Sequence, residues 1–119
     1  MEHTATTCRA REILDRIGDK WSLQVIALLG EHTKRFTELK REIDGISQRM
    51  LTVTLRALER DGIVVRTVYP VVPPRVEYSL TPMGATLMDA ACGLVEWAEG
   101  HLPEIDAARA EYDARATEP

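Results

Sequence analysis

Several common features are scarce in this chain of 119 residues. Aromatic residues make up only 5% of it, so a core built from its 45% hydrophobic residues must be mainly aliphatic. Two cysteines, Cys8 and Cys92, are too few for a disulfide framework and are typical of a reducing compartment. The longest strongly apolar run, Val25–Leu29, is too short to span a bilayer, and the polar N-terminus is unlike a signal peptide. We therefore expect one cytoplasmic domain, residues 1–119, with no membrane segment.

Motifs for catalysis and for metal binding are also missing from the sequence. The three histidines, His3, His32 and His101, do not have the spacing of metal ligands. There is no glycine-rich phosphate loop and no nucleophile elbow. Cys8 and His3 are too local a pair, and too near the chain end, to act as a catalytic dyad. The sequence thus argues against an enzyme and predicts neither a cofactor nor a metal site.

Charge is distributed unevenly along the chain. The net charge of −4 by itself argues against a polyanionic partner. Residues 34–76, however, carry nine basic and five acidic residues, whereas residues 77–119 carry two basic and nine acidic ones. Because salt screens charges beyond about 8–10 Å, a nearby polyanion responds to the local basic segment rather than to the total charge. This segment favours a nucleic-acid partner, with an ordinary solvated surface as the other interpretation.

Apolar residues at helical spacing predict a mainly α-helical chain. Gly30 and Pro103 are expected to end helices, because glycine favours a helix C-terminus and proline removes a hydrogen bond from the helix. The short segment from Thr33 to Phe36 is expected to be extended. The predicted helices cover residues 8–17, 20–29, 37–43, 47–60, 82–102 and 104–115.

The helix predicted over residues 47–60 has two different faces. Ser47 is a good N-cap, because its hydroxyl can accept hydrogen bonds from the free amides of the first turn. Gly62 suits the C-terminal stop, and Gly45 suits the tight turn before the helix, since glycine tolerates positive φ. Two short helices joined by such a turn are typical of a helix-turn-helix. The apolar stripe expected to face the core consists of Met50, Leu51, Leu55 and Leu58.

A β-hairpin is predicted directly after this helix. Residues 63–69 are rich in β-branched and aromatic side chains, and residues 76–80 alternate apolar and polar ones. The prolines between them cannot donate ladder hydrogen bonds and therefore indicate a loop. Thr81-Pro82 then predicts the start of another helix, with Thr as N-cap and Pro at the first helical position. The predicted fold is a winged helix-turn-helix, mainly α with a small β-hairpin wing, whose DNA-binding core is residues 34–80.

Several short motifs, taken in their order and spacing, resemble those of a known family. They are Lys20-Trp21, Arg35-Phe36 with Glu38-Leu39, Ile46-Ser47 with Leu51, Leu55 through Leu58-Glu59, Asp61-Gly62, Pro73-Pro74-Arg75-Val76-Glu77-Tyr78, and Leu80-Thr81 with Gly84. Over roughly residues 8–95 the chain resembles the HxlR family of bacterial winged helix-turn-helix transcriptional regulators, which are relatives of the MarR regulators. The resemblance implies a homodimer that binds palindromic operator DNA, and a redox or small-molecule signal in some members.

The second helix of a helix-turn-helix enters the major groove, where Arg can pair with guanine and Gln with adenine. We therefore expect Gln48, Arg49 and Thr52 to contact the groove and Arg56 to contact phosphate, unless Arg56 has a partner within its own helix. Arg75, expected at the tip of the wing, suits a minor groove or a nearby phosphate, although a stiff proline loop also occurs without any ligand. The expected DNA-binding residues are Lys34, Arg35, Thr37, Ser47, Gln48, Arg49, Thr52, Arg56, Pro74 and Arg75.

Apolar residues after Pro82 are spaced alternately by four and three, as in a coiled-coil seam. This spacing would also suit a core helix within one chain. A small winged helix needs little core from so long a terminal helix, so we expect a C2 dimer through residues 8–17 and 82–115. The expected interface residues are Ile13, Ile17, Met83, Leu87, Ala90, Leu94 and Trp97.

Cys8 is a candidate redox sensor on two grounds. It lies at or just before a predicted helix start, close to Arg9 and Arg11, where the helix dipole and positive charge favour a reactive thiolate. The family resemblance implies such a role for a cysteine near this position in some members. An inert thiol is the equal alternative, and Cys92 is expected to serve packing.

These observations together predict a sequence-specific DNA-binding transcriptional regulator that acts as a homodimeric repressor. The expected partners are double-stranded operator DNA, a second copy of the chain and an inducer, either an oxidant or electrophile or another small molecule. The alternative is a winged-helix module for protein–protein contact without DNA binding. Such a module has no need for nine basic residues within residues 34–76.

Overall fold

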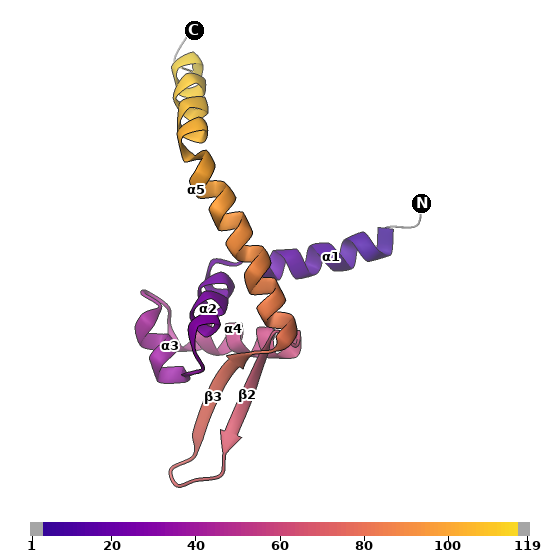
Figure 1. The fold of residues 1–119 in the computed structure, drawn as a ribbon, viewed down its shortest axis with the longest axis vertical. Helices are drawn as coiled ribbons and strands as arrows, with labels where there is room; N and C mark the ends of the chain where they lie inside the picture. The colour runs from indigo at the N-terminus through magenta and orange to yellow at the C-terminus, as the bar shows by residue number, and fades with distance from the viewer. Residues whose placement is uncertain (1–3, 117–119) are drawn as a thin grey trace. The chain divides into compact units, whose positions relative to one another are not determined.

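The computed structural model describes residues 4–116 (Figure 1). Internal contacts divide the chain into two compact units, one ending at Met88 and one beginning at Asp89. The predicted fold class, mainly α-helical with a small β wing, is confirmed. In chain order, the elements are α1 (Thr4–Ile17), α2 (Lys20–Glu31), β1 (Lys34–Arg35), α3 (Phe36–Glu42), α4 (Gln48–Arg60), β2 (Val64–Tyr69), β3 (Arg75–Leu80) and α5 (Pro82–Ala116).

The helix α4 begins and ends where its local sequence predicts. The amide of Met50 donates to the hydroxyl of Ser47 at 3.0 Å, so Ser47 is the N-cap. Gly45 and Gly62 have φ angles of 83° and 75°, in the left-handed region where a side chain would be strained. The helix-turn-helix α3–turn–α4 is therefore fixed at both ends of α4 by residues with a specific backbone task.

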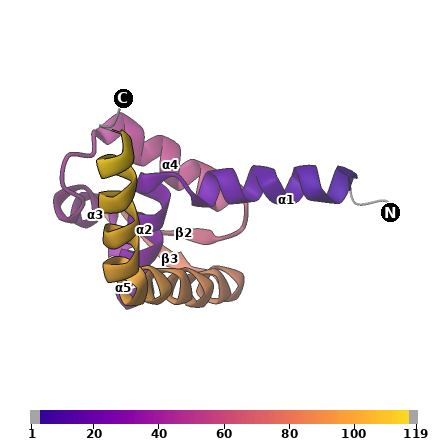
Figure 2. The same ribbon diagram turned by 90° about the horizontal axis from the view of Figure 1, so that it is seen from above.

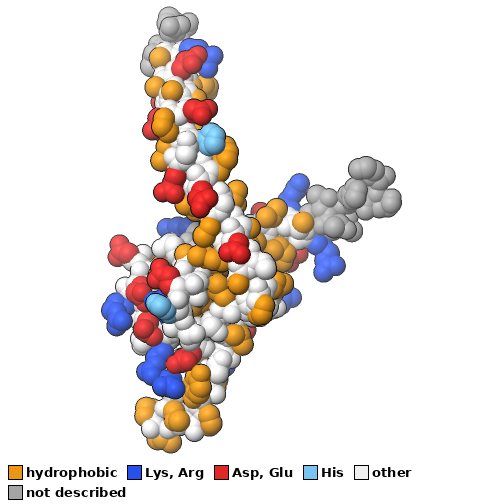
Figure 3. All heavy atoms as spheres, viewed as in Figure 1, with side chains coloured by type: hydrophobic (Ala, Val, Ile, Leu, Met, Phe, Trp, Pro, Cys, Tyr) orange, Lys and Arg blue, Asp and Glu red, His pale blue; other side chains and the backbone are white. Residues whose placement is uncertain are grey.

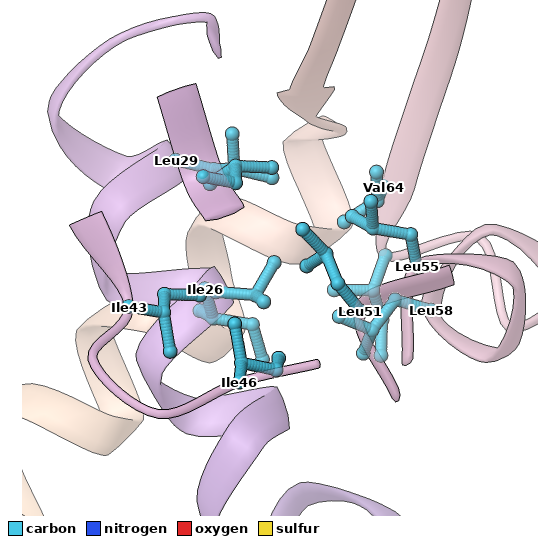
Figure 4. Packing of buried hydrophobic residues seen from close by; sticks show 11 residues of the cluster. Ile26, Leu29, Ile43, Ile46, Leu51, Leu55, Leu58 and Val64 are labelled. Atoms are coloured by element: carbon cyan, nitrogen blue, oxygen red, sulfur yellow. The ribbon is translucent and has the colours of Figure 1, made fainter. Parts of the chain in front are cut away.

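The core of the first unit lies between α2, α3, α4 and the sheet. Both ribbon views place α2 next to α4 (Figure 1 and Figure 2), and in Figure 4 the side chains of these elements point toward one another. Burying an aliphatic side chain stabilises a fold by roughly 1.5–3 kcal/mol, so this cluster is the main source of stability. Its buried members are Val25, Ile26, Leu29, Leu39, Ile43, Ile46, Leu51, Leu55, Leu58, Ile63 and Val64.

The prediction that Met50 belongs to the buried stripe of α4 is wrong, because this side chain is 40% exposed. The buried arc is centred on Leu51, Leu55 and Leu58, and Thr54 occupies its remaining position at 4% exposed. Met50 precedes Leu51 by one residue, which rotates it about 100° away around the helix. The apolar stripe is thus narrower than the sequence indicates.

The sheet has three antiparallel strands in the order β1-β3-β2, one more than the predicted hairpin. Strands β2 and β3 pair along six residues each, from Val64 opposite Leu80 to Tyr69 opposite Arg75. The extended segment predicted near Thr33 to Phe36 becomes β1, whose two residues pair with the middle of β3. The third strand connects the start of α3 to the wing.

Two predicted helix ends are wrong. The helix α2 continues through Gly30 to Glu31, and Gly30 serves close packing instead, because a Cβ there would come within 2.9 Å of Cε of Met88. Pro103 lies inside α5, which remains one helix to Ala116. A proline removes only one donor, and the residues that follow it include several alanines, glutamates and arginines, which favour a helix.

The start of α5 is confirmed. The hydroxyl of Thr81 accepts from the amide of Gly84 at 3.0 Å, which is the N-cap contact, and donates to the carbonyl oxygen of Gly62 at 2.6 Å. Gly84 is buried, and a Cβ there would collide with the carbonyl oxygen of Ile63. One threonine thus joins the start of α5 to the junction between α4 and β2.

The second unit consists of the part of α5 that follows Met88. Trp97 and His101 stack at 4.6 Å between ring centroids, one helical turn apart, and Trp97 is still 58% exposed. Leu94, at 71%, is more exposed still. Within residues 4–116, no helix combines the length and hydropathy needed to cross a membrane.

Candidate nucleic-acid interface

The outward face of α4 brings the predicted base-reading residues together. A shallow hollow of about 510 Å³ on this face is lined by Gln48, Arg49, Thr52, Val53 and Arg56. All except the half-buried Thr52 are exposed, while the opposite face of the helix is sealed in the core. Helical periodicity therefore predicts this grouping correctly, because residues 48, 49, 52 and 56 fall on one side of a single helix.

Local hydrogen bonds limit what Ser47 and Thr52 can offer a ligand. The hydroxyl oxygen of Ser47 already accepts from the amide of Met50, so its O–H proton is what remains for an outside acceptor. The hydroxyl of Thr52 donates to the carbonyl oxygen of Gln48 at 2.9 Å. Its oxygen can still accept, and its methyl group can make an apolar contact.

Arg49 and Arg56 are the two cations of this face, and neither has an ion-pair partner within residues 4–116. The intrahelical pairing considered for Arg56 is thus not found there. Both arginines are exposed, and the donors of their guanidinium groups suit the oxygen and nitrogen acceptors of DNA.

Arg66 is a candidate that the sequence analysis did not identify. It lies on β2 and lines a cleft of about 360 Å³ together with Arg56 and Glu59 of α4. The aromatic rings of Phe36 and Tyr78 also line this cleft. The alternation of side chains along a strand indicates which residues share a face with Arg66. It does not indicate that this face lies beside α4, so no sequence signal identifies Arg66 as part of the site.

Lys34 does not fit its predicted role as a phosphate contact. It is 7% exposed, and its Nζ lies 3.0 and 3.1 Å from the two carboxylate oxygens of Glu42. A lysine buried in this way must keep a partner, because an unpaired buried charge is strongly unfavourable. We therefore leave Lys34 out of the candidate interface and assign it to holding β1 against the end of α3.

Arg35 and Thr37 lie at the start of α3, and both are exposed. The carboxylate of Glu38 accepts from the backbone amide of Arg35 at 2.9 Å, which fixes the first turn of the helix. The guanidinium of Arg35 is left for the surface. These two residues stay predictions as phosphate contacts.

Arg75 lies at the base of the wing loop rather than at its outer end. It begins β3, opposite Tyr69, and its guanidinium carbon is 4.7 Å from the centroid of the Tyr69 ring. Its Nε is also 3.5 Å from a carboxylate oxygen of Glu77. The guanidinium is thus held on the hairpin, while Pro74 and the rest of the loop project beyond it.

The end of α4 is attached to α1 by one arginine. Nη1 of Arg16 lies 3.2 Å from the carboxylate of Asp61, the residue after the last turn of α4, and donates to the carbonyl oxygen of Ala57 at 3.3 Å. A cation at this position also interacts favourably with the negative end of the helix dipole. The C-terminal end of α4 is therefore held by α1.

Cys8 lies farther inside α1 than its sequence predicts. The helix α1 begins at Thr4, so Cys8 lies in the second turn and not at the helix start. The influence of the helix dipole falls off within the first turn, which removes that part of the prediction. Cys8 and Cys92 are both exposed free thiols.

Most of the predicted dimer residues are exposed in the single chain. Ile13, Met83, Leu94 and Trp97 are 40–71% exposed, and Ala90 is also exposed. Ile17 is half-buried. Leu87 differs from the others, because it packs against the core of the first unit.

Comparison with known proteins agrees with this geometry. Residues 16–106 match the HxlR-like helix-turn-helix family. The chain belongs to this family. It is 45% identical over 110 residues to the HTH-type transcriptional regulator YtfH of Escherichia coli strain K12, covering 92% of this chain and 87% of that protein. The resemblance inferred from the sequence motifs is thus confirmed.

Solved structures of similar regulators share the fold of this chain. The redox regulator HypR in its reduced form is 43% identical, with a TM-score of 0.75 over 83% of this chain and 98% of that one. The reduced form of the transcriptional regulator YodB from Bacillus subtilis is 34% identical, with a TM-score of 0.71 over 76% of this chain and 89% of that one. This HxlR-like chain is accordingly a transcriptional regulator with a helix-turn-helix domain.

Proposed function

We propose that this HxlR-like protein is a sequence-specific DNA-binding repressor that acts as a homodimer. The observation that carries the proposal is the hollow on α4, where Gln48, Arg49, Thr52 and Arg56 lie together on the outward face of the helix. The family supports it, because its members are helix-turn-helix regulators. Repression follows most simply if the bound protein occludes a promoter.

In the proposed complex, α4 lies in the major groove with its N-terminus deepest. Gln48 and Arg49 then reach base edges, where Arg pairs with guanine and Gln with adenine. Thr52 contributes an acceptor and a methyl group, which suit an exocyclic amine or a thymine methyl group. Arg56 of α4 and Arg66 of β2 line one cleft, and we expect them to hold a phosphate there.

Dimerisation is proposed through the exposed apolar residues of α1 and α5. A C2 dimer presents two copies of α4 to half-sites about one helical turn of DNA apart, which makes the operator palindromic. Leu94 and Trp97 are the strongest candidates, because both are large, apolar and more than half exposed. Leu87 contributes to the core of its own chain and is a weaker candidate.

The proposed inducer is an oxidant, an electrophile or another small ligand. Redox regulators are among the relatives with this fold, and Cys8 is an exposed thiol flanked by Arg9 and Arg11. Mass spectrometry after brief treatment with diamide, a thiol oxidant, should find Cys8 modified before Cys92. The reverse order would remove Cys8 as the sensor, and Cys8→Ser is the matched variant that should keep DNA binding but lose the response.

The test of DNA binding begins with selection from a pool of random 30-base-pair duplexes, followed by titration of the enriched duplex at several salt concentrations. Arg49→Ala should weaken binding by about 1–3 kcal/mol, relax specificity at one position of each half-site and reduce the salt slope. Arg109→Ala, which removes an exposed arginine of the second unit, is the matched control and should bind as the wild type does. Selection without enrichment, or binding of an enriched duplex that Arg49→Ala leaves unchanged, would make the protein–protein module the better assignment.

A further inference from the structure

The outer end of the wing is apolar and carries no charge. Between Arg66 and Arg75 no residue is ionisable except Tyr69, and the loop itself reads Pro-Val-Val-Pro-Pro. Val72 is 99% exposed and Val71 is 51% exposed. Hydrophobic side chains cover this tip of the molecule, at the bottom of Figure 3. A tip without charge does not suit the phosphate contacts that basic wings make.

The nearest cation is held away from the tip. Arg75 pairs across the hairpin with Tyr69, lies on its ring at 4.7 Å and contacts the carboxylate of Glu77 at 3.5 Å. Its guanidinium is therefore held beside the strands and not at the outer end of the loop. Valine and proline are therefore the first side chains that a partner meets at this end of the molecule.

The hairpin has the length to reach the groove beside the one that α4 reads. Strands β2 and β3 pair over six residues, which at about 3.3 Å per residue gives roughly 20 Å. One turn of duplex DNA is about 34 Å, so a major groove and its neighbouring minor groove are centred roughly 17 Å apart. Because β2 follows α4 after three residues, the tip can meet the minor groove while α4 lies in the major groove.

The tip is also stiff enough to act on DNA without first being ordered. Pro70, Pro73 and Pro74 fix three φ angles in the loop, and the amide of Val71 donates to the carbonyl oxygen of Tyr69 at 2.8 Å. A preorganised loop loses little conformational entropy on binding. Architectural DNA-binding proteins use rigid apolar wedges in the same way, unstacking a base step from the minor-groove side.

We propose that Val71 and Val72 form an apolar wedge that enters the minor groove flanking each half-site and bends the operator there. The inference rests on the proposed DNA-binding function of α4. It adds a source of specificity without base contacts, because a flexible TA or CA step is easier to deform than an A-tract. In the dimer there are two wedges, one at each outer flank of the operator. A protein partner for the tip is the competing occupant.

The experiment uses the duplex enriched by the wild-type protein, labelled at both ends for energy transfer. Val72→Ala should weaken binding about tenfold, reduce the bend and leave the salt slope unchanged, since no phosphate contact is lost. Val65→Ala is the matched control, because Val65 is 42% exposed and lies on β2 at the end far from the loop, and it should change neither quantity. Replacing the flanking step with an A-tract should weaken wild-type binding more than binding by Val72→Ala.

The outcomes separate the wedge from the function on which it rests. If Arg49→Ala binds DNA as tightly as the wild type, DNA reading by α4 is contradicted, and the wedge with it. If Arg49→Ala binds DNA more weakly but Val72→Ala leaves both the affinity and the bend unchanged, only the wedge is contradicted. The tip would then be assigned to a protein partner. A reduced salt slope for Val72→Ala would also contradict the wedge, because it would mean that the tip acts through phosphate contacts.

Discussion

The helix α4 and the part of α5 after Met88 both carry apolar residues at helical spacing, but the two stripes end in opposite environments. Leu51, Leu55 and Leu58 of α4 are at most 2% exposed, whereas Leu94 and Trp97 of α5 are 71% and 58% exposed. Spacing identifies the apolar face of a helix and does not identify what covers it. The face of α4 is covered by its own chain, and we propose that a second copy covers the face of α5.

The sharpest test of this difference compares one leucine from each stripe. Leu55→Ala should lower the free energy of unfolding by about 2–5 kcal/mol, because it leaves a cavity in the core. Leu94→Ala should lower it by less than roughly 0.5 kcal/mol in the monomer, as expected for a surface position. Urea unfolding at low protein concentration, followed by circular dichroism, measures both values, and equal losses would contradict the comparison.

The next prediction concerns self-association. Leu94→Glu should weaken the proposed dimer by about 2–4 kcal/mol, since it places a charge in an apolar interface. Val95→Glu is the matched control, because Val95 is 57% exposed and lies off the seam, next to Leu94 in sequence. Light scattering over a dilution series should show monomers for the first variant only. A persistent dimer in Leu94→Glu would refute the seam.

Glycines offer a third way to compare the two regions. Gly84→Ala should destabilise the first unit by about 1–3 kcal/mol, because the new Cβ collides with the backbone carbonyl of Ile63. Gly100→Ala should instead stabilise the helix of the second unit by about 0.5–1 kcal/mol, since nothing lies within 4 Å of the new Cβ. Thermal unfolding followed at 222 nm distinguishes these signs, and a destabilised Gly100→Ala would mean that α5 is covered there.

The last prediction concerns the cap of α4. Ser47→Ala should cost about 1 kcal/mol, because the amide of Met50 loses its acceptor. Ser47→Asp is the matched control and should retain stability, since a carboxylate also caps the helix and suits the dipole. Urea unfolding of the two variants measures the difference. Equal stability of Ser47→Ala and the wild type would mean that water replaces the cap without loss.

The sequence predicts those features whose cause is local. The cap at Ser47, the positive φ angles of Gly45 and Gly62, the cap at Thr81 and the face of α4 all depend on neighbours within a few residues. What it does not predict depends on distant partners: Gly30 against Met88, Lys34 with Glu42, and the pairing of β1 with β3.

The candidate site divides in the same way. Gln48, Arg49, Thr52 and Arg56 share one helix, so periodicity alone groups them, and their contact with DNA stays a prediction. Arg66 joins the site only through the packing of β2 beside α4. Arg75 lies at the base of the wing loop because the strand register places it opposite Tyr69. Neither fact can be read from a single sequence.

The free edges of the sheet bear on how the protein behaves at high concentration. An exposed apolar hairpin is a common starting point for fibrils, because an unpaired strand edge recruits strands from other molecules. Here β1 offers only two residues at one edge, and β2, at the other, carries Arg66 and runs into Pro70. Proline has no N–H to donate, so the loop that presents Val72 cannot extend the sheet. The chain can therefore expose an apolar wing and still resist growth into fibrils.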